Sequence, residues 1–390
     1  MKFAAIDEAK YNVETPLIQF STTRSIYFVN VTIGSPPVPQ YLQIDTGSSL
    51  TWVRKSSDPP RQYFYNPDAS HTFKYISCGD PICSSNSRFI CLAQKTNHCG
   101  YVIMYMDMTK SSGVIGYDRF GFVNYTDPGN PSIVESVLFG ALGNINNGTK
   151  LNNDPQYYGI LGLGPESTSL VNHLPKPNTF RYCVENLSRA NESQGYLFFG
   201  EVEGDYDDVL TTPIIQGYDH YIVEIVSICL DGVCLEIDPS VFKNVQGNVH
   251  TGVEIDTGSI LSYLPDVAYD AVEQAVSKMM ESKNKSKFPK KSSFLCYKGN
   301  LNDVFHEYYP FLTINFAGGG ARMTITHTEY FYQLIPSLYC LSFRKTSLFG
   351  ERYKNLTILG LQSQQHHVFE FDLDNWTMGI FGDTTCDVPL

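Results

Sequence analysis

An aspartate on a Thr-Gly-Ser turn occurs twice in this sequence, once in each half of the chain. The two segments are Ile44–Ser48 and Ile255–Ser259, and an apolar stretch typical of a strand precedes each aspartate. If a pseudo-twofold axis brings the two turns together, Asp45 and Asp256 lie so close that both cannot easily ionise, and they share one proton. The ionised carboxylate can then take a proton from a bound water while its protonated partner hydrogen-bonds the carbonyl that the water attacks. This chemistry is hydrolysis without a covalent intermediate.

The neighbours of the two aspartates have the types that such a pair needs. Glycine lets backbone approach the carboxyl groups, the threonine hydroxyls can hydrogen-bond across the axis, and the serine hydroxyls can donate to the outer oxygen of the adjacent aspartate. For a single copy, an ordinary turn in which the aspartate bonds its own backbone would be the simpler interpretation. We expect six supporting residues: Thr46, Gly47, Ser48, Thr257, Gly258 and Ser259.

A second repeated signal supports an internal duplication. About a hundred residues after each aspartate the chain carries Ile-Leu-Gly, at 160–162 and at 358–360. Four matching signals in the same order favour two related lobes that meet at the aspartates.

The composition predicts that strands position these residues. The chain has 390 residues, 42% of them apolar and 13% aromatic, which is enough for two cores. Its 26 Tyr, 24 Phe, 30 Gly and 21 Pro favour strands and turns, and one helix is predicted from Pro265 to Ser282. We expect a mostly β protein with strands at Ser25–Ile33, Tyr41–Ile44, Tyr101–Met104, Gly195–Gly200 and Tyr221–Ile228.

Charge and motif content exclude several classes of partner. Lys and Arg total 28 against 40 Asp and Glu, a formal charge of -12 that repels phosphate backbones, so we expect no nucleic-acid partner. No apolar run approaches the roughly 20 residues of a membrane span. Adjacent residues on a strand point to opposite faces, so His366 and His367 cannot chelate one ion, and we expect neither a metal nor a cofactor.

The cysteines and the glycosylation sequons point to the secretory route. Ten cysteines without a Cys-x-x-Cys spacing favour disulfides and an oxidising compartment, outside the cell or in a vacuole. The first residues lack the apolar core of a signal peptide, so we expect that a leader was removed or is not part of this sequence. The candidate glycosylation sites are Asn30, Asn124, Asn147, Asn186, Asn191, Asn284, Asn355 and Asn375.

From Tyr27 to about Cys386 the chain resembles the pepsin-like aspartic proteases, and among them the nepenthesin-type plant branch. The resemblance rests jointly on Asp-Thr-Gly-Ser-Ser-Leu-Thr-Trp-Val at 45–53, Gly-Ile-Leu-Gly-Leu-Gly at 159–164, Asp-Thr-Gly-Ser-Ile-Leu-Ser-Tyr-Leu-Pro at 256–265 and Ile-Leu-Gly at 358–360. It implies a bilobal pepsin-like fold, with two pseudo-twofold-related, barrel-like β lobes and a cleft between them.

The resemblance also suggests how the chain divides. One unit would span 27–382, with an N-terminal lobe at 27–203 that carries Asp45 and a C-terminal lobe at 204–382 that carries Asp256. Residues 1–26 would be an N-terminal tail, with a prosegment remnant as one interpretation.

In the family a β-hairpin flap closes over the substrate, and its tyrosine bonds a tryptophan after the first motif. These roles carry over to Tyr105 and Trp52, although a sheet tyrosine packed in a core is the alternative for Tyr105. Flaps of this branch usually have Tyr-Gly-Asp-Gly, whereas this chain has Met106 and Met108 in place of the glycines. With these side chains lining the cleft, we expect a preference for apolar residues around the cleaved bond.

The resemblance implies disulfide pairs as well. It suggests pairing of Cys183 with Cys386 and of Cys296 with Cys340, which leaves Cys229 and Cys234 for a local bridge. The remaining four would pair among themselves beside the flap: Cys78, Cys83, Cys91 and Cys99.

The resemblance therefore implies an aspartic endopeptidase that works at acid pH on polypeptides, binds pepstatin-type inhibitors and is a monomer. The alternative is a catalytically inactive relative that acts as an inhibitor of cell-wall-degrading enzymes or in a receptor-like role outside the cell. Such relatives often lose the second Asp-Thr/Ser-Gly or the flap tyrosine, and this chain has lost neither.

Overall fold

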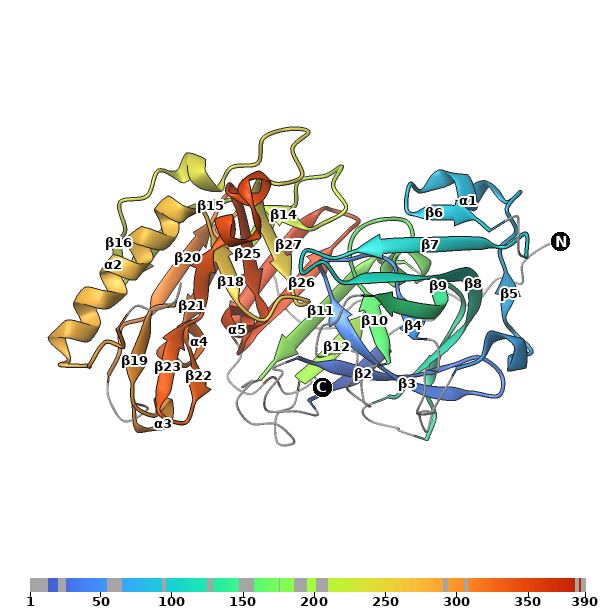
Figure 1. The fold of residues 1–390 in the computed structure, drawn as a ribbon, viewed down its shortest axis with the longest axis horizontal. Coiled ribbons are helices and arrows are strands. Elements are labelled where there is room, and N and C mark those ends of the chain that lie inside the picture. The colour runs from blue at the N-terminus through green and yellow to red at the C-terminus, as the bar shows by residue number, and fades with distance from the viewer. Residues whose placement is uncertain are drawn as a thin grey trace.

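Two groups of strands lie side by side in the computed structural model, with one long helix along the outer side of the C-terminal group (Figure 1). This arrangement confirms the predicted mostly β, bilobal fold. The structure describes residues 13–19, 26–54, 65–92, 96–124, 129–146, 158–174, 176–185, 195–200, 210–289, 294–304, 308–382 and 386.

The largest sheet connects the two halves of the chain. It contains 15 strands of the described residues, and β26 from the C-terminal half pairs with β11 from the N-terminal half. The two lobes therefore share a continuous sheet. In sheet order its strands are β13 (Thr211–Pro213), β27 (Thr377–Gly382), β26 (His367–Asp372), β11 (Thr179–Val184), β12 (Gly195–Phe199), β1 (Val13–Ile18), β2 (Phe28–Ile33), β3 (Val38–Asp45), β10 (Gly159–Gly162), β4 (Trp52–Arg54), β9 (Ser132–Asn146), β8 (Lys110–Phe122), β7 (Cys99–Met104) and β6 (Phe89–Cys91), with β5 (Lys74–Tyr75) beside β8.

Three smaller sheets build the rest of the C-terminal lobe. The first contains β14 (Ile222–Val223), β17 (Gly252–Asp256), β25 (Leu356–Gly360), β18 (Ser262–Leu264) and β24 (Phe343–Lys345). The second contains β16 (Val233–Cys234), β15 (Ile225–Leu230), β20 (Leu312–Phe316) and β21 (Arg322–Ile325), and the third β19 (Cys296–Lys298), β23 (Leu338–Leu341) and β22 (Phe331–Ile335).

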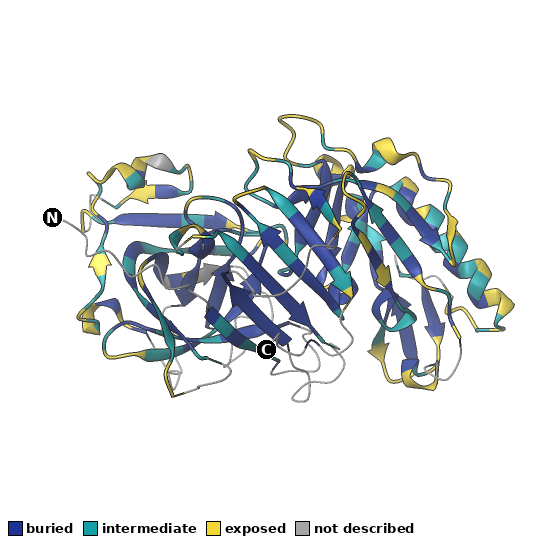
Figure 2. Ribbon diagram, turned by 180° about the vertical axis from the view of Figure 1, so that it is seen from behind, coloured by how far each residue is buried: buried dark blue, intermediate teal, exposed yellow. Residues whose placement is uncertain are grey.

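Helix α2 (Asp266–Ser282) confirms the predicted helix, and Pro265 lies at its N-cap. Its buried residues Ala268, Val272 and Val276 are spaced at helical intervals and face the core, while its outer side is exposed (Figure 2). Among the described residues, no helix has the length and hydropathy of a membrane span. The short helices and 3-10 turns are α1 (Pro81–Ser85), α3 (Leu301–Val304), α4 (His327–Tyr330), α5 (Leu361–Gln364), η1 (Pro67–Ala69), η3 (Leu170–His173), η4 (Pro239–Phe242), η5 (Thr346–Phe349) and η6 (Glu351–Tyr353).

The duplicated motifs form the same local structure in both halves. Strand β3 ends at Asp45 and lies parallel to β10, which places Asp45 opposite Gly162. Strand β17 ends at Asp256 and lies parallel to β25, which places Asp256 opposite Gly360. Each Ile-Leu-Gly strand also pairs antiparallel with the strand that follows the aspartate, β4 in one half and β18 in the other. The internal repeat is therefore structural.

The expected N-terminal tail at 1–26 is wrong for residues 13–18. These residues form β1, which pairs with β12 on one side and β2 on the other. Its side chains alternate between buried and half-buried positions, so β1 is an integral strand of the large sheet. The partner β12 lies far away in sequence, which is why local pattern did not identify it. The predicted lobe boundary at residue 203 lies outside the described residues and stays a prediction.

Disulfides close both halves of the fold. Two of them join the segment between β5 and β7, and another ties Cys386 near the chain end to β11. The pairs Cys183–Cys386 and Cys296–Cys340, which the resemblance implies, and the local bridge Cys229–Cys234 are confirmed. The other four cysteines pair among themselves, as expected, and the structure gives the pairs as Cys78–Cys91 and Cys83–Cys99.

Candidate active site

Reciprocal hydrogen bonds hold the two Asp-Thr-Gly turns together. Thr46 N donates to Thr257 Oγ1 at 3.0 Å, and Thr257 N donates to Thr46 Oγ1 at 3.0 Å. The hydroxyl of Thr46 in turn donates to the carbonyl of Ile255 at 2.8 Å, and that of Thr257 donates to the carbonyl of Ile44 at 3.1 Å. Both threonines are buried, so this cross-bracing is shielded from water and fixes the relative position of the turns.

The bracing brings the two carboxyl groups, here called the dyad, against each other. Asp45 accepts hydrogen bonds from Ser48 Oγ at 2.5 Å and from Gly47 N at 3.0 Å, and Asp256 accepts one from Gly258 N at 2.7 Å. A Cβ atom at Gly47 would lie 2.5 Å from Asp256 Oδ1, and one at Gly258 would collide with Asp45 Oδ1. The glycines are therefore required because each passes directly beside the opposite carboxyl group.

The surroundings of the dyad raise the pKa of both carboxyl groups and so favour a dyad that keeps a proton. Burial raises the pKa of Asp45 above its usual range, against the hydrogen bonds from its own turn. The pKa of Asp256 is raised to about 8 by burial, by the charge of Asp45 and by Glu254, despite hydrogen bonds from Ser259 and Gly258. Two carboxyls this close titrate as a unit and share one proton.

The predicted flap is the hairpin of β7 and β8, whose last register pair joins Met104 and Lys110. At its tip, Tyr105 accepts a hydrogen bond of 2.7 Å from Trp52 Nε1, so the two residues are paired as the resemblance implies. Met108 has a φ of 68° and is 59% exposed, a backbone conformation that favours glycine. The methionine that replaces the family's glycine thus keeps a glycine-like backbone and extends into solvent.

Met106 reaches the opposite lobe. It packs against a C-terminal cluster formed by Tyr353, Leu356 and Ile358, together with Tyr263 and Phe349. The rings of Tyr263 and Phe349 are 4.6 Å apart. The flap tip therefore meets an apolar surface across the dyad.

Sequence reasoning did not identify Tyr263 as a site residue. It follows Asp256 at the same interval at which Trp52 follows Asp45, and the strands that carry the two residues, β18 and β4, are equivalent in the repeat. Aligning the two halves of the chain beyond the Asp-Thr-Gly-Ser motif would therefore have found it.

The candidate glycosylation sites differ in accessibility. Asn284, Asn355 and Asn375 are exposed, and Asn30 and Asn124 are half-buried. Three sites lie outside the described residues: Asn147, Asn186 and Asn191.

In the histidine pair at 366–367, one ring contacts the protein's own backbone. His367 is buried, and its Nδ1 lies 2.8 Å from the carbonyl oxygen of Gln365. Within the described ranges, no group of three or more His, Cys, Asp or Glu side chains is placed to hold a metal ion.

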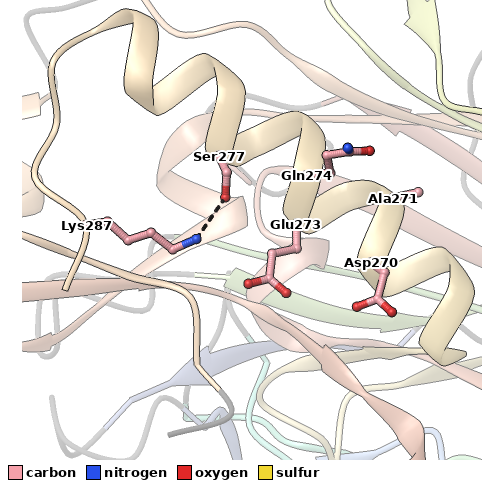
Figure 3. A pocket seen from close by; sticks show the side chains of 6 residues that line it. All are labelled: Asp270, Ala271, Glu273, Gln274, Ser277 and Lys287. Atoms are coloured by element: carbon pink, nitrogen blue, oxygen red, sulfur yellow. Dashed lines mark hydrogen bonds between the residues drawn. The ribbon is translucent and has the colours of Figure 1, made fainter. Parts of the chain in front are cut away.

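A depression also lies along helix α2 (Figure 3). One interaction closes part of it, the hydrogen bond from Lys287 Nζ to Ser277 Oγ at 3.4 Å. None of the dyad, flap or cluster residues lines it, so it is not the candidate site. Its lining residues are Asp270, Ala271, Glu273, Gln274, Ser277 and Lys287.

Comparisons with known proteins agree with this geometry. The family model described as xylanase inhibitor N-terminal matches residues 27–201, and that described as xylanase inhibitor C-terminal matches residues 220–381. Aspartic proteinase 39 of Arabidopsis thaliana is 26% identical over 97% of this chain and 79% of its own length. Aspartic proteinase nepenthesin-1 of Nepenthes gracilis is 25% identical over 90% of this chain and 76% of its own length.

Solved structures support the same fold. The crystal structure of edgp superposes with a TM-score of 0.77 at 17% identity and covers 98% of both chains. Basic 7S globulin from soybean gives a TM-score of 0.73 at 20% identity, over 95% of this chain and 96% of its own. With both family models matched in order and both Asp-Thr-Gly turns in place, the chain belongs to the plant branch of the pepsin-like aspartic protease family.

Proposed function

We propose that this protein is an aspartic-type endopeptidase that hydrolyses peptide bonds with a water activated by Asp45 and Asp256. The observation that carries the proposal is the dyad itself: two carboxyl groups on equivalent turns, Asp45 buried and Asp256 half-buried, each turn's glycine lying against the other's carboxyl.

Each carboxyl has a distinct role in this chemistry. Asp45, which ionises first, takes a proton from the water held between the two groups, and the resulting hydroxide attacks the peptide carbonyl carbon. Asp256, which holds the shared proton, donates a hydrogen bond to the carbonyl oxygen as it becomes tetrahedral. Collapse of this intermediate breaks the C–N bond when a proton reaches the leaving nitrogen. The active form carries one proton on the dyad, so activity is expected on the acid side of neutrality.

The flap supports a preference for apolar residues around the cleaved bond. Met106 and the cluster of Tyr263, Phe349 and Tyr353 offer an apolar surface to side chains of an extended polypeptide. The protein is expected to act as a monomer on polypeptides and to bind pepstatin-type inhibitors. Its five disulfides support a place in the secretory pathway, outside the cell or in a vacuole.

Replacing Tyr105 with phenylalanine is expected to lower kcat/KM by about fivefold. The change removes the acceptor of the 2.7 Å bond from Trp52 Nε1, and one such bond is worth about 1 kcal/mol. Steady-state kinetics on a peptide substrate would measure the loss. Tyr75→Phe is the matched control, because it removes a hydroxyl that bonds Asp68 at the surface. Equal rates for Tyr105→Phe and the wild type would contradict the flap assignment.

Digestion of a denatured globin from pH 2.5 to pH 7, with and without a pepstatin-type inhibitor, tests the proposed function. An acid-side optimum that the inhibitor abolishes supports the endopeptidase. No cleavage by a folded, disulfide-intact protein anywhere in that range overturns it.

A binding role is the second candidate, favoured by one observation: both matching family models are described by a xylanase inhibitor. In that case the cleft or its rim would bind a protein partner without cleaving it. Absence of cleavage together with inhibition of a xylanase would favour this candidate, whereas inhibitor-sensitive cleavage favours the endopeptidase.

A further inference from the structure

An ion pair beside the dyad is not used by the proposed chemistry. His220 Nδ1 lies 2.9 Å from Glu254 Oε1. We propose that this pair is a positioning element that sets the electrostatic field at the dyad and with it the pH range in which Asp45 and Asp256 share one proton. The inference rests on the proposed function for its kinetic readout, but protonation of the dyad can also be measured without catalysis.

The geometry of strand β17 places Glu254 close to the dyad. It lies two positions before Asp256 on β17, and residues at this interval project from the same face of a strand. Its side chain is buried, with 5% of the residue exposed. After burial, its charge contributes to the raised pKa of both Asp45 and Asp256.

The N-terminal half has an uncharged residue of the same shape at the equivalent position. Gln43 lies two positions before Asp45, is also 5% exposed, and donates from Nε2 to the carbonyl of Gly258 at 3.5 Å. A neutral amide therefore satisfies the fold at this position. The carboxylate of Glu254 is not explained by packing alone.

His220 also has an uncharged counterpart. Ile255 N donates to the carbonyl of Tyr221, and Ile44 N donates to that of Tyr27, so these two tyrosines are equivalent in the repeat. The residue before Tyr27 is Ile26, which is buried, whereas the residue before Tyr221 is His220. Both partners of the ion pair thus occur in one half only, which makes the field at the dyad asymmetric.

Further charges hold the pair in place across the two halves. Asp219 Oδ1 lies 3.3 Å from His220 Nε2 and also forms an ion pair with Arg88, which comes from the disulfide-linked segment before β6. Arg88 pairs in addition with Glu166, in the segment after β10. The other titratable or charged groups near the pair are His250 and Arg352.

The state of the pair determines its effect on the dyad. Burial disfavours the charged ring, but Glu254, Asp219 and Asp256 raise the pKa of His220 to about 10. The ring therefore stays protonated over the range in which the dyad titrates, and its charge offsets that of Glu254. Removing one partner leaves the other's charge uncompensated in a buried site, where it acts strongly on its neighbours.

Two variants should therefore move the pH profile of kcat/KM in opposite directions. Glu254→Gln removes the negative charge beside the dyad, so the dyad loses its proton more easily and the alkaline limb shifts to lower pH by about one unit. His220→Asn leaves Glu254 negative, so the limb shifts to higher pH by a similar amount. The double variant, which is neutral like the intact pair, should lie between the two. Glu236→Gln and His71→Asn, both at exposed positions, are the matched controls and should leave the limb unchanged.

Urea unfolding at stepped pH measures the same proton without catalysis. Burial and the neighbouring charges raise the pKa of Asp256 from 3.8 to about 8, so the folded protein binds the proton more tightly than the unfolded chain does. The stabilisation from this proton is complete below the unfolded value and is lost as the pH rises through the folded value. The pH at which the free energy of unfolding stops falling should be lower in Glu254→Gln and higher in His220→Asn than in the wild type.

The two readouts separate the inference from the proposed function. Opposite shifts in both readouts support the inference. Opposite shifts in the unfolding profile of a protein that cleaves nothing support it while the proposed function fails. A third outcome is that the folded variants cleave the substrate while the alkaline limb of kcat/KM and the unfolding profile do not shift, or shift in the same direction in both variants. That result overturns the inference and leaves the proposed function intact.

Discussion

Replacing Asp256 with asparagine is expected to lower kcat/KM by a factor of about 10³ or more, because the dyad then loses its shared acidic proton. Asparagine has nearly the same shape and can still accept the hydrogen bond from Gly258 N. It cannot, however, carry the proton that the two carboxyls share, nor donate an acidic proton to the substrate carbonyl. The measurement is kcat/KM for a peptide substrate from acid to neutral pH.

Stability and a control variant distinguish this loss from misfolding. Because burial, Asp45 and Glu254 raise the pKa of Asp256 to about 8, ionisation at this position destabilises the folded state as the pH rises towards that value. Asparagine does not ionise, so the variant should unfold with no loss of free energy relative to wild type at pH 8. Asp303→Asn, at an exposed position on α3, should retain full activity. Cleavage by Asp256→Asn within tenfold of wild type would mean that the dyad is not the catalytic group.

The parts of the site that the sequence predicted are those encoded by local motifs. The Asp-Thr-Gly-Ser turns, the Ile-Leu-Gly strands and helix α2 each rest on a short segment whose residue types fix its backbone. The duplication also predicted the long-range contact between the two turns, because equivalent segments of two related lobes must meet about an axis. Resemblance supplied the fold and two of the disulfide pairs, Cys183–Cys386 and Cys296–Cys340, which spacing alone does not determine.

The features that the sequence did not predict depend on contacts between distant segments. Strand β1 is defined by its partner β12, and Met106 finds its partners in a cluster near residue 353. Glu254 lies between the buried residues Val253 and Ile255 and would be expected at the surface from its residue type alone. Its burial becomes reasonable only once His220, from the loop before β14, is seen beside it.

The repeat also shows how a symmetric scaffold can give its two aspartates different tasks. The turns, the threonine bracing and the Ile-Leu-Gly strands are equivalent, so they favour equal proton affinities. A departure breaks the symmetry: Glu254, two positions before Asp256, stands where the other half has Gln43. Its charge is one of the causes that raise the pKa of Asp256 to about 8, which favours ionisation of Asp45 before Asp256, the order that base and acid roles require.

Replacing Thr257 with valine is expected to lower the free energy of unfolding by about 2–4 kcal/mol, because two buried backbone groups lose their partners. Valine keeps the shape of threonine but cannot accept the hydrogen bond from Thr46 N or donate to the carbonyl of Ile44. Urea unfolding measures the loss. The activity should fall as well, because these bonds hold the two turns, and with them the dyad carboxyls, in register.

If the threonine hydrogen bonds hold the two turns together, two further variants should give results that a packing effect alone does not predict. Thr257→Ser keeps the hydroxyl and loses only a methyl group, so its cost should be about 1 kcal/mol and its activity close to wild type. Thr46→Val breaks the equivalent pair of bonds, to Thr257 N and to the carbonyl of Ile255, so the pseudo-twofold axis predicts the same loss as for Thr257→Val. If Thr257→Val and Thr257→Ser cost the same, the hydroxyl bonds contribute little, and the sheets beneath the turns must hold the dyad together instead.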